Sequence, residues 1–223
     1  CLCNAPTAEA ADAVHREAHG LRAARIMEVT PEMADAFMGI AEADGAGAVI
    51  LPDNSGHDPG TRTVFFTDIV GSTDMTRRLG DDAAFEILSV HDRIVRDALA
   101  SNNGREVKHT GDGIMASFIS AACAVRCGMA VLQDVVSHGA AEPNLQVRLG
   151  IAAGEPIEHA NDLFGTTVQL AARLCARAQP GQILISNVVA ELCAGKMLPI
   201  RDAGRFELKG FDEPVLAHAV HAS

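Results

Sequence analysis

The pattern of apolar and polar positions along the chain changes near residue 60. After that point, short apolar runs that predict β-strands alternate with longer segments in which apolar residues return every three or four positions, as in helices. The predicted strands are residues 63–67, 105–110, 114–118, 145–154, 182–186, 205–210 and 214–220. The predicted helices are a short one after residue 68 and longer ones at 81–100, 120–136 and 166–178. This order predicts an α+β domain with a largely antiparallel sheet and its helices on one side.

The helix predicted at 81–100 has a clear apolar stripe. Residues at helical spacing are expected to turn together toward the core of the domain. In this segment they are Phe85, Leu88, Ile94, Val95 and Ala98.

The first sixty residues have a different pattern. Residues 1–43 predict a partial N-terminal α/β segment, and residues 44–60, which are rich in turn-forming residues, predict a linker. The chain begins at Cys1 within an alternating apolar pattern, so its first element is expected to be incomplete. The main domain is therefore predicted to span residues 61–223.

Composition narrows the class of protein. The chain has 223 residues, 48% of them hydrophobic, and a formal net charge of -11 at pH 7. That charge argues against a nucleic-acid partner, because a phosphate backbone would be repelled. No run of 18 apolar residues and no secretory signal is found, which predicts a cytoplasmic protein that does not bind a membrane. The six cysteines lack zinc-site spacing and are expected to be reduced thiols.

Two aspartates stand where strands end. Asp68 closes the apolar stretch "TVFFTDIVGST", and Asp112 lies between two glycines in an Asp-Gly turn that predicts a β-hairpin. If these strands are neighbours, the two carboxylates converge and form a Mg²⁺ site, which substrate phosphates would complete. The turn that ends at Gly71, Ser72 and Thr73 would present backbone N–H groups to phosphate oxygens at a helix start. Each feature alone has a simpler explanation, since a strand-terminal Asp is often a helix cap and an Asp-Gly pair often only a turn.

Five motifs in order change this picture. The stretches "FFTDIVGST", "KHTGDGIMASF", "VRLGIAAGE", "DLFGTTVQLAARL" and "FELKG" together resemble the class III adenylate/guanylate cyclase catalytic domain over residues 60–221. The resemblance implies a ferredoxin-like βαββαβ core and a homodimer with active sites in its interface. It also implies conversion of ATP to 3′,5′-cyclic AMP and pyrophosphate for signal transduction.

The resemblance assigns a metal site and a purine site. Asp68 and Asp112 match the metal-binding aspartates, with the Ile69 carbonyl as a further ligand, for two Mg²⁺ or Mn²⁺ ions per active site. Lys108 and Asp162 match the pair that recognises the purine. A lysine that donates to adenine N1 and a carboxylate that accepts from the 6-amino group favour ATP over GTP, because guanine presents the reverse pattern.

The resemblance also assigns phosphate contacts. Arg173 matches the arginine that stabilises the transition state, and Arg148 and Lys209 match phosphate-binding residues. From the residues alone, Arg148 could equally be a surface strand residue, and Lys209 an ordinary turn lysine. No dedicated general base stands out, and His109 is expected to point away from Lys108 because neighbouring strand residues alternate.

Gln169 departs from the family pattern, which usually has Asn at this catalytic position to orient the ribose and Arg173. The extra methylene could misplace the amide by about 1 Å, which can cost on the order of 10²-fold in rate. The alternative function is therefore a catalytically weak cyclase-like module that binds nucleotide and regulates a partner. A diguanylate cyclase is disfavoured because the chain lacks a Gly-Gly-Asp/Glu-Glu-Phe-type hairpin.

The N-terminal segment carries a looser resemblance. Residues 1–30 resemble the second half of a ferredoxin-like domain family that includes nickel-responsive proteins. His15 and His19 are four residues apart on a predicted helix and could hold one metal ion. Solvent-exposed helix histidines are the simpler interpretation.

Overall fold

The structure is a computed structural model that describes residues 60–138, 145–159 and 162–221, with six further positions before residue 17. His15 and His19 lie outside the described residues, as do most residues of the predicted N-terminal segment and linker. The chain divides into two compact units, and the larger one contains Pro59–Ser223. Of the helices within the described ranges, none has the length and apolar content needed to cross a bilayer.

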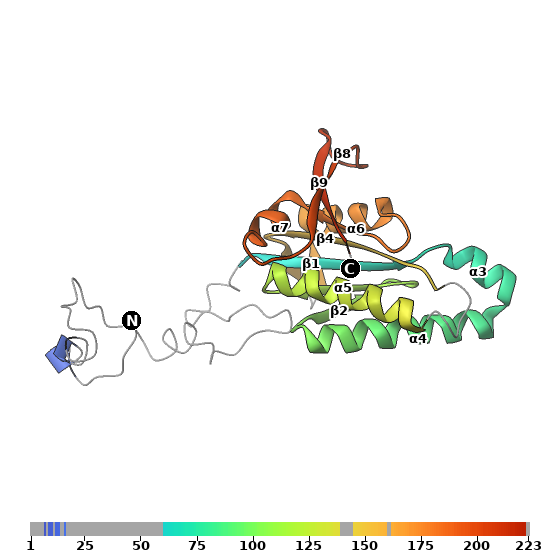
Figure 1. Cartoon of the computed structure of the whole chain (residues 1–223), viewed down its shortest axis with the longest axis horizontal. Helices are drawn as coiled ribbons and strands as arrows, with labels where there is room; N and C mark the ends of the chain where they lie inside the picture. The colour runs from blue at the N-terminus through green and yellow to red at the C-terminus, as the bar shows by residue number, and fades with distance from the viewer. Residues whose placement is uncertain are drawn as a thin grey trace. The chain divides into compact units, whose positions relative to one another are not determined.

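A seven-stranded sheet organises the domain, with the strand order β2-β3-β1-β4-β7-β9-β8 (Figure 1). A separate two-stranded ribbon joins β5 and β6. The strands are β1 (Arg62–Ile69), β2 (Arg105–His109), β3 (Ile114–Phe118), β4 (Val147–Gly154), β5 (Ile157–His159), β6 (Asp162–Phe164), β7 (Ile183–Ser186), β8 (Ile200–Phe206) and β9 (Val215–Val220). The helices are α3 (Ser72–Leu79), α4 (Asp81–Ser101), α5 (Ala121–His138), α6 (Thr166–Arg177) and α7 (Asn187–Leu192).

The connectivity confirms the α+β, ferredoxin-like prediction. β1 is antiparallel to both β3 and β4, and β2 is antiparallel to β3. With α4 between β1 and β2, and α5 between β3 and β4, these four strands form the βαββαβ unit in the spatial order β4-β1-β3-β2. The parallel pairing of β4 with β7 continues the sheet, and β9 and β8 add an antiparallel edge.

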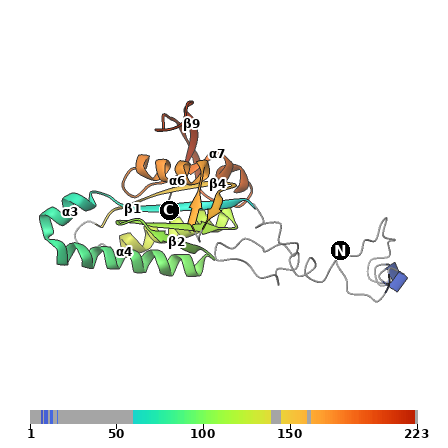
Figure 2. The ribbon, with the colours of Figure 1, turned by 180° about the vertical axis from the view of Figure 1, so that it is seen from behind.

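Helices cover both faces of the sheet, so the prediction of helices on one side is wrong. Side chains alternate along a strand. Phe65 and Ile69 of β1 therefore join α4 and α5 in the main core, whereas Val64 and Phe66 pack with Leu163 and Ala171 of β6 and α6. Figure 1 shows α4 and α5 below β1 and α6 above it, and the view from behind agrees (Figure 2).

One core residue predicted for α4 is wrong. Phe85 is 68% exposed, whereas the buried stripe comprises Ala84, Ile87, His91, Ile94, Val95, Ala98 and Leu99. Successive helix residues are about 100° apart, so a shift of one position moves a side chain off the buried face. The small Ala84 takes the inward position, and the large ring beside it faces solvent.

The C-terminal elements differ in detail from their prediction. β8 begins at Ile200 and ends at Phe206, rather than spanning 205–210, and its register shifts between Asp202 and Gly204. The short helix α7 and the β5–β6 ribbon were not predicted. These elements are three to seven residues long and offer too few positions for a period to emerge.

Gly150 allows α6 to lie directly against β4. A Cβ atom at this glycine would lie 2.2 Å from the carbonyl oxygen of Ala171 and 2.2 Å from the amide nitrogen of Cys175. Any side chain would therefore push the helix off the strand. The backbone of α6 is in this way fixed against the middle of the sheet.

Candidate active site

Asp68 and Asp112 are brought together at one end of β1. The Ile69 N–H donates to the Asp112 carbonyl at 3.1 Å, and Ser72 Oγ donates to Asp112 Oδ2 at 2.5 Å. Gly113 permits this approach, because a Cβ atom there would lie 1.9 Å from the Thr67 carbonyl oxygen. The hairpin between β2 and β3 therefore rests directly on the backbone of β1, with Asp112 beside Asp68.

The electrostatics of the two carboxylates favour a cation. Burial raises the pKa of Asp68, the guanidinium of Arg148 offsets part of this rise, and the nearby Asp112 carboxyl raises the pKa further. The charged form of Asp68, which burial and the Asp112 carboxyl disfavour, is stabilised when positive charge arrives between the two groups. Asp68 does not cap the following helix, because α3 has Gly71 as its N-cap residue.

Arg148 supplies positive charge to Asp68 within the chain. It lies opposite Asp68 in the β1–β4 register, so both side chains are on the face that α6 covers. Arg148 Nε donates to Asp68 Oδ2 at 2.6 Å, Nη2 lies 2.5 Å from the same oxygen, and Nη1 donates to the Ala176 carbonyl at 2.8 Å. The sequence prediction of a phosphate-binding Arg148 did not include this ion pair.

The residues present fit an ion such as Mg²⁺, whose coordination shell would be completed by substrate oxygens. Within residues 60–138, 145–159 and 162–221, no three His, Cys, Asp or Glu side chains gather at one metal position. The protein offers two close carboxylates, which are hard oxygen donors. Mg²⁺ prefers such a partial set, because it keeps waters and takes further oxygens from substrate phosphates.

Lys108 and Asp162 meet although they are 54 residues apart. Lys108 Nζ donates to Asp162 Oδ2 at 2.5 Å, and the ammonium lies 5.6 Å from the centre of the Phe164 ring. Lys108 is on β2 and Asp162 begins β6, and these strands are in contact. A donor and an acceptor therefore lie side by side at an accessible position.

The helix α6 presents two predicted site residues. Gln169 and Arg173 are four residues apart and both exposed, so they lie on one face of the helix. Arg173 Nε donates to the Lys209 carbonyl at 3.2 Å, which links α6 to the segment between β8 and β9. Two residues with separately predicted roles, Arg173 and Lys209, are thus brought together through the backbone of Lys209.

Comparison with known proteins identifies the family. Residues 57–222 match the adenylate and guanylate cyclase catalytic domain. The chain belongs to this family. An uncharacterized protein of Mycobacterium tuberculosis is 37% identical over 157 residues, which are 70% of this chain and 40% of that protein. An adenylate cyclase of Streptomyces coelicolor is 33% identical over 140 residues, covering 63% of this chain and 35% of that protein.

Solved structures agree with this assignment. The crystal structure of the adenylyl cyclase CyaB from P. aeruginosa superposes with a TM-score of 0.65 at 27% identity, covering 73% of this chain and 94% of that one. The chain spans less than half the length of the curated relatives described above. It contains a nucleotide cyclase catalytic domain.

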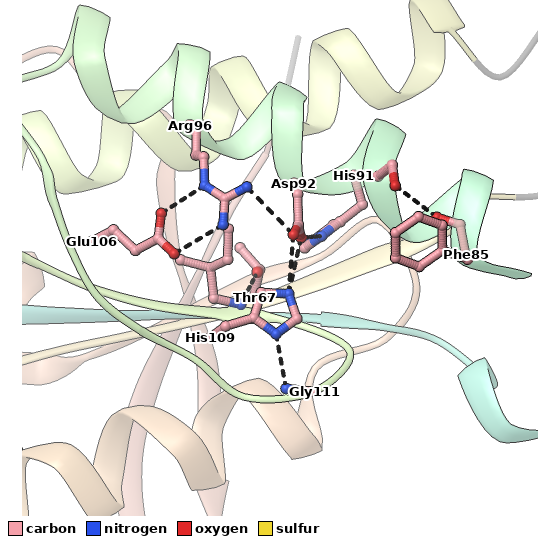
Figure 3. Close-up of polar contacts among 10 residues, drawn as sticks. Thr67, Phe85, His91, Asp92, Arg96, Glu106, His109 and Gly111 are labelled. Atoms are coloured by element: carbon pink, nitrogen blue, oxygen red, sulfur yellow. Dashed lines mark hydrogen bonds and ion pairs between the residues drawn. The ribbon is translucent and has the colours of Figure 1, made fainter.

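The sequence analysis missed a polar network on the α4 side of this cyclase domain. Asp92 of α4 is within hydrogen-bonding distance of both His91 and His109, and Arg96 joins α4 to Glu106 of β2 (Figure 3). The predicted orientation of His109, away from Lys108, agrees with its contact to α4. The sequence signal that could have predicted this network was a His close to the Asp112 turn, His109, together with an Asp on the inner side of the preceding helix, Asp92.

Proposed function

We propose that the cyclase domain is an adenylate cyclase that converts ATP to 3′,5′-cyclic AMP and pyrophosphate. The observation that carries this proposal is the contact between Lys108 Nζ and Asp162 Oδ2. It supports a purine site in which one donor and one acceptor lie next to each other. The adenylate cyclase of Streptomyces coelicolor, at 33% identity, points in the same direction.

The polarity of this pair favours adenine. Adenine presents an acceptor at N1 and a donor at its 6-amino group, so the ammonium of Lys108 and the carboxylate of Asp162 satisfy both. Guanine presents an N–H at N1 and an oxygen at C6, which would leave both protein groups facing groups of their own kind. A site built to hydrogen-bond one pattern of donors and acceptors rejects a base that presents the reverse pattern.

In the proposed reaction the ribose 3′-oxygen forms a bond to the α-phosphorus. The bond from that phosphorus to the bridging β-oxygen breaks, pyrophosphate leaves, and the hydroxyl proton is released. Asp68 and Asp112 would hold Mg²⁺ or Mn²⁺, which when bound lowers the pKa of the hydroxyl and neutralises the phosphates. Arg173 would bind the charged phosphorus centre, Lys209 and Arg148 the phosphates, and Gln169 the ribose.

Arg148 must change partners during this cycle. Its guanidinium neutralises Asp68 in the structure, and the same group is proposed to bind phosphate. Arg148 would have to leave Asp68 to bind the triphosphate, and Asp68 and Asp112 would then hold a cation that supplies the positive charge Arg148 gives Asp68 in the structure. The turn at Gly71, Ser72 and Thr73 would add backbone N–H groups at the start of α3.

The proposed active enzyme is a homodimer. One protomer would contribute the metal-binding aspartates and its partner would contribute Lys108 and Asp162. Each interface would then hold complete sites only when two chains pair, so an isolated chain would be inactive.

A parallel assay of cyclic nucleotide formation tests the proposal. The full chain is incubated with ATP or GTP and with Mg²⁺ or Mn²⁺, and cyclic product and pyrophosphate are quantified. Cyclic AMP formation at least tenfold faster than cyclic GTP formation is expected. Comparable rates with both nucleotides would contradict adenylate specificity.

The second candidate is a catalytically weak, nucleotide-binding regulatory module. Gln169 in place of the usual Asn favours it, because Gln169 shares the exposed face of α6 with Arg173. Binding of ATP without release of pyrophosphate in the same assay would support this function. Restoration of turnover by Gln169→Asn would then identify the extra methylene as the cause.

A further inference from the structure

The hairpin tip that carries Asp112 is held on a second side, away from β1. The Gly111 N–H donates to His109 Nδ1 at 3.1 Å, and His109 Nε2 lies 3.0 Å from Asp92 Oδ2 (Figure 3). This chain of contacts runs from helix α4 through one imidazole ring to the backbone next to Asp112. Neither Asp92 nor His109 has a part in the function proposed above.

The contacts select one state of the His109 ring. A backbone N–H can only donate, so Nδ1 must carry the lone pair that accepts from Gly111. The proton of the neutral ring is then on Nε2, the atom that faces the Asp92 carboxylate. A carboxylate that accepts from one ring nitrogen fixes the tautomer and the orientation of the other.

Asp92 is itself held in place. It accepts from His91 Nδ1 at 3.1 Å, and Arg96 Nη1 lies 3.5 Å from Asp92 Oδ2. His91 is fully buried, and Arg96 also binds Glu106 of β2 at 2.7 Å. The carboxylate that orients His109 therefore belongs to a network in which its own position is determined by α4 and β2.

We propose that His109 and Asp92 are positioning residues that hold the Gly111–Gly113 tip so that Asp112 stays beside Asp68. This inference rests on the proposed metal-dependent function. The structural basis is a tip held by the Ile69 N–H on the β1 side, by Ser72 Oγ at the start of α3 and by His109 on the α4 side. Ser72 holds the Asp112 carboxylate, whereas His109 holds the backbone beside it, so loss of the His109 contact would let the tip move and lower the affinity of the aspartate pair for a divalent ion.

Two substitutions at His109 distinguish its contact with the Gly111 N–H from its contact with Asp92. In His109→Asn the side-chain oxygen lies where Nδ1 was and keeps an acceptor for the Gly111 N–H. In His109→Gln the side-chain nitrogen lies where Nε2 was and keeps a donor to Asp92 but no acceptor for Gly111. The His109 side chain is 33% exposed, so both variants are expected to fold, which circular dichroism checks. Arg93→Gln, at an exposed position of α4 next to Asp92, is the control.

The first readout needs neither metal nor nucleotide. Hydrogen exchange of the Gly111 amide, measured by NMR on the full chain, should accelerate about 3- to 10-fold in His109→Gln, as expected for one lost hydrogen bond. It should stay within about twofold of the wild type in His109→Asn and Arg93→Gln. Equal acceleration in both His109 variants, or in neither, would overturn the proposal.

The second readout is direct binding of Mn²⁺ alone, followed by calorimetry. His109→Gln should weaken binding about threefold or more, and His109→Asn should restore most of the loss. In turnover, His109→Gln should raise the Mn²⁺ concentration for half-maximal rate while the KM for ATP changes little. Unchanged Mn²⁺ binding in His109→Gln would contradict the positioning role. An inactive wild type with the expected exchange pattern would instead refute only the proposed cyclase reaction.

Discussion

At the scale of single residues, the contact between Lys108 and Asp162 gives the most direct test of substrate choice. The double variant Lys108→Glu with Asp162→Asn reverses both polarities, so that Glu accepts from guanine N1 and Asn donates to its C6 oxygen. We expect the ratio of kcat/KM for ATP to that for GTP to fall at least tenfold, measured with purified protein. The single Lys108→Glu variant is the control, since it places two carboxylates together and should lower the same ratio with a larger loss of rate.

Arg148 gives a second residue-scale prediction, because one side chain neutralises Asp68 and is proposed to bind phosphate. Arg148→Gln removes a positive charge from the aspartate pair, so Mn²⁺ binding without nucleotide should tighten several-fold, as expected for a partly exposed ion pair. The kcat should fall in the same variant. Calorimetry and turnover measure the two effects, and weaker Mn²⁺ binding would show that Arg148 mainly holds Asp68 in place.

His91 predicts a pH dependence of stability. Burial lowers its pKa in the folded chain, and the Asp92 carboxylate opposes part of this shift. Below the unfolded value of about 6.5, the unfolded chain binds a proton that the folded chain does not, so the free energy of unfolding falls as the pH falls. This loss levels off once the pH is below the folded pKa.

The variant His91→Asn isolates this contribution. It keeps a donor near the position of Nδ1 but cannot titrate. Urea unfolding at pH 7.5 and pH 5.5 should show a smaller loss of stability at low pH in the variant than in the wild type. Identical losses in the two proteins would mean that His91 takes up its proton equally in both states.

At the scale of elements, the β2–β3 hairpin depends on a residue without a side chain. Gly113→Ala would place a methyl group against the Thr67 carbonyl, so the hairpin must move away from β1. We expect a loss of about 2–4 kcal/mol in the free energy of unfolding and no measurable cyclase activity. Chemical denaturation and the cyclic nucleotide assay check both effects.

Gly128→Ala on α5 is the matched control. Its Cβ would lie 3.1 Å from the side chain of Ile183, which can adjust. Alanine also favours the helix by up to about 1 kcal/mol. The stability of this variant should therefore change by less than about 1 kcal/mol, and a loss equal to that of Gly113→Ala would show that any methyl group is equally harmful.

The sequence predicted those helices and strands that have a long hydrophobic pattern formed by residues close together in the chain. The order of strands and helices followed from the apolar runs and one Asp-Gly turn. The proximity of Asp68 and Asp112 was conditional on their strands being neighbours, and the resemblance to the cyclase domain implied a shared metal site. Phe85 was misplaced because Ala84 offers a weaker signal than the ring beside it. The position of α6 on the other face, where Gly150 lets the helix lie directly against β4, is a tertiary feature that no local pattern contains.

The network around Asp92 was missed for a related reason. The sequence places His109 beside Lys108 and near Asp112, and both of these relations run along the chain. Its partner Asp92 is 17 residues earlier, on a helix, and only the packing of α4 against β2 brings the two together. The ion pair of Asp68 with Arg148 likewise depends on the β1–β4 register.

At the scale of the whole molecule, the proposed homodimer predicts complementation. Asp68→Ala should inactivate the metal site of one protomer, and Lys108→Ala should inactivate the purine site of the other. Each protein alone should be nearly inactive, but a mixture should recover up to about a quarter of the wild-type activity through heterodimers with one intact site. Cyclic AMP formation as a function of mixing ratio measures this recovery, and its absence would place all these groups in one chain.

The close contact of α6 with Gly150 also affects the positions of the predicted site residues on that helix. The backbone of α6 contacts the backbone of β4 there, so the positions of Arg173 and Gln169 depend on the packing at the centre of the sheet. A larger side chain between α6 and β4 would displace both residues. In the proposed reaction, residues that do not contact the nucleotide would thus affect the rate of turnover. Substitutions in this buried layer would then change that rate without altering any group that contacts the substrate.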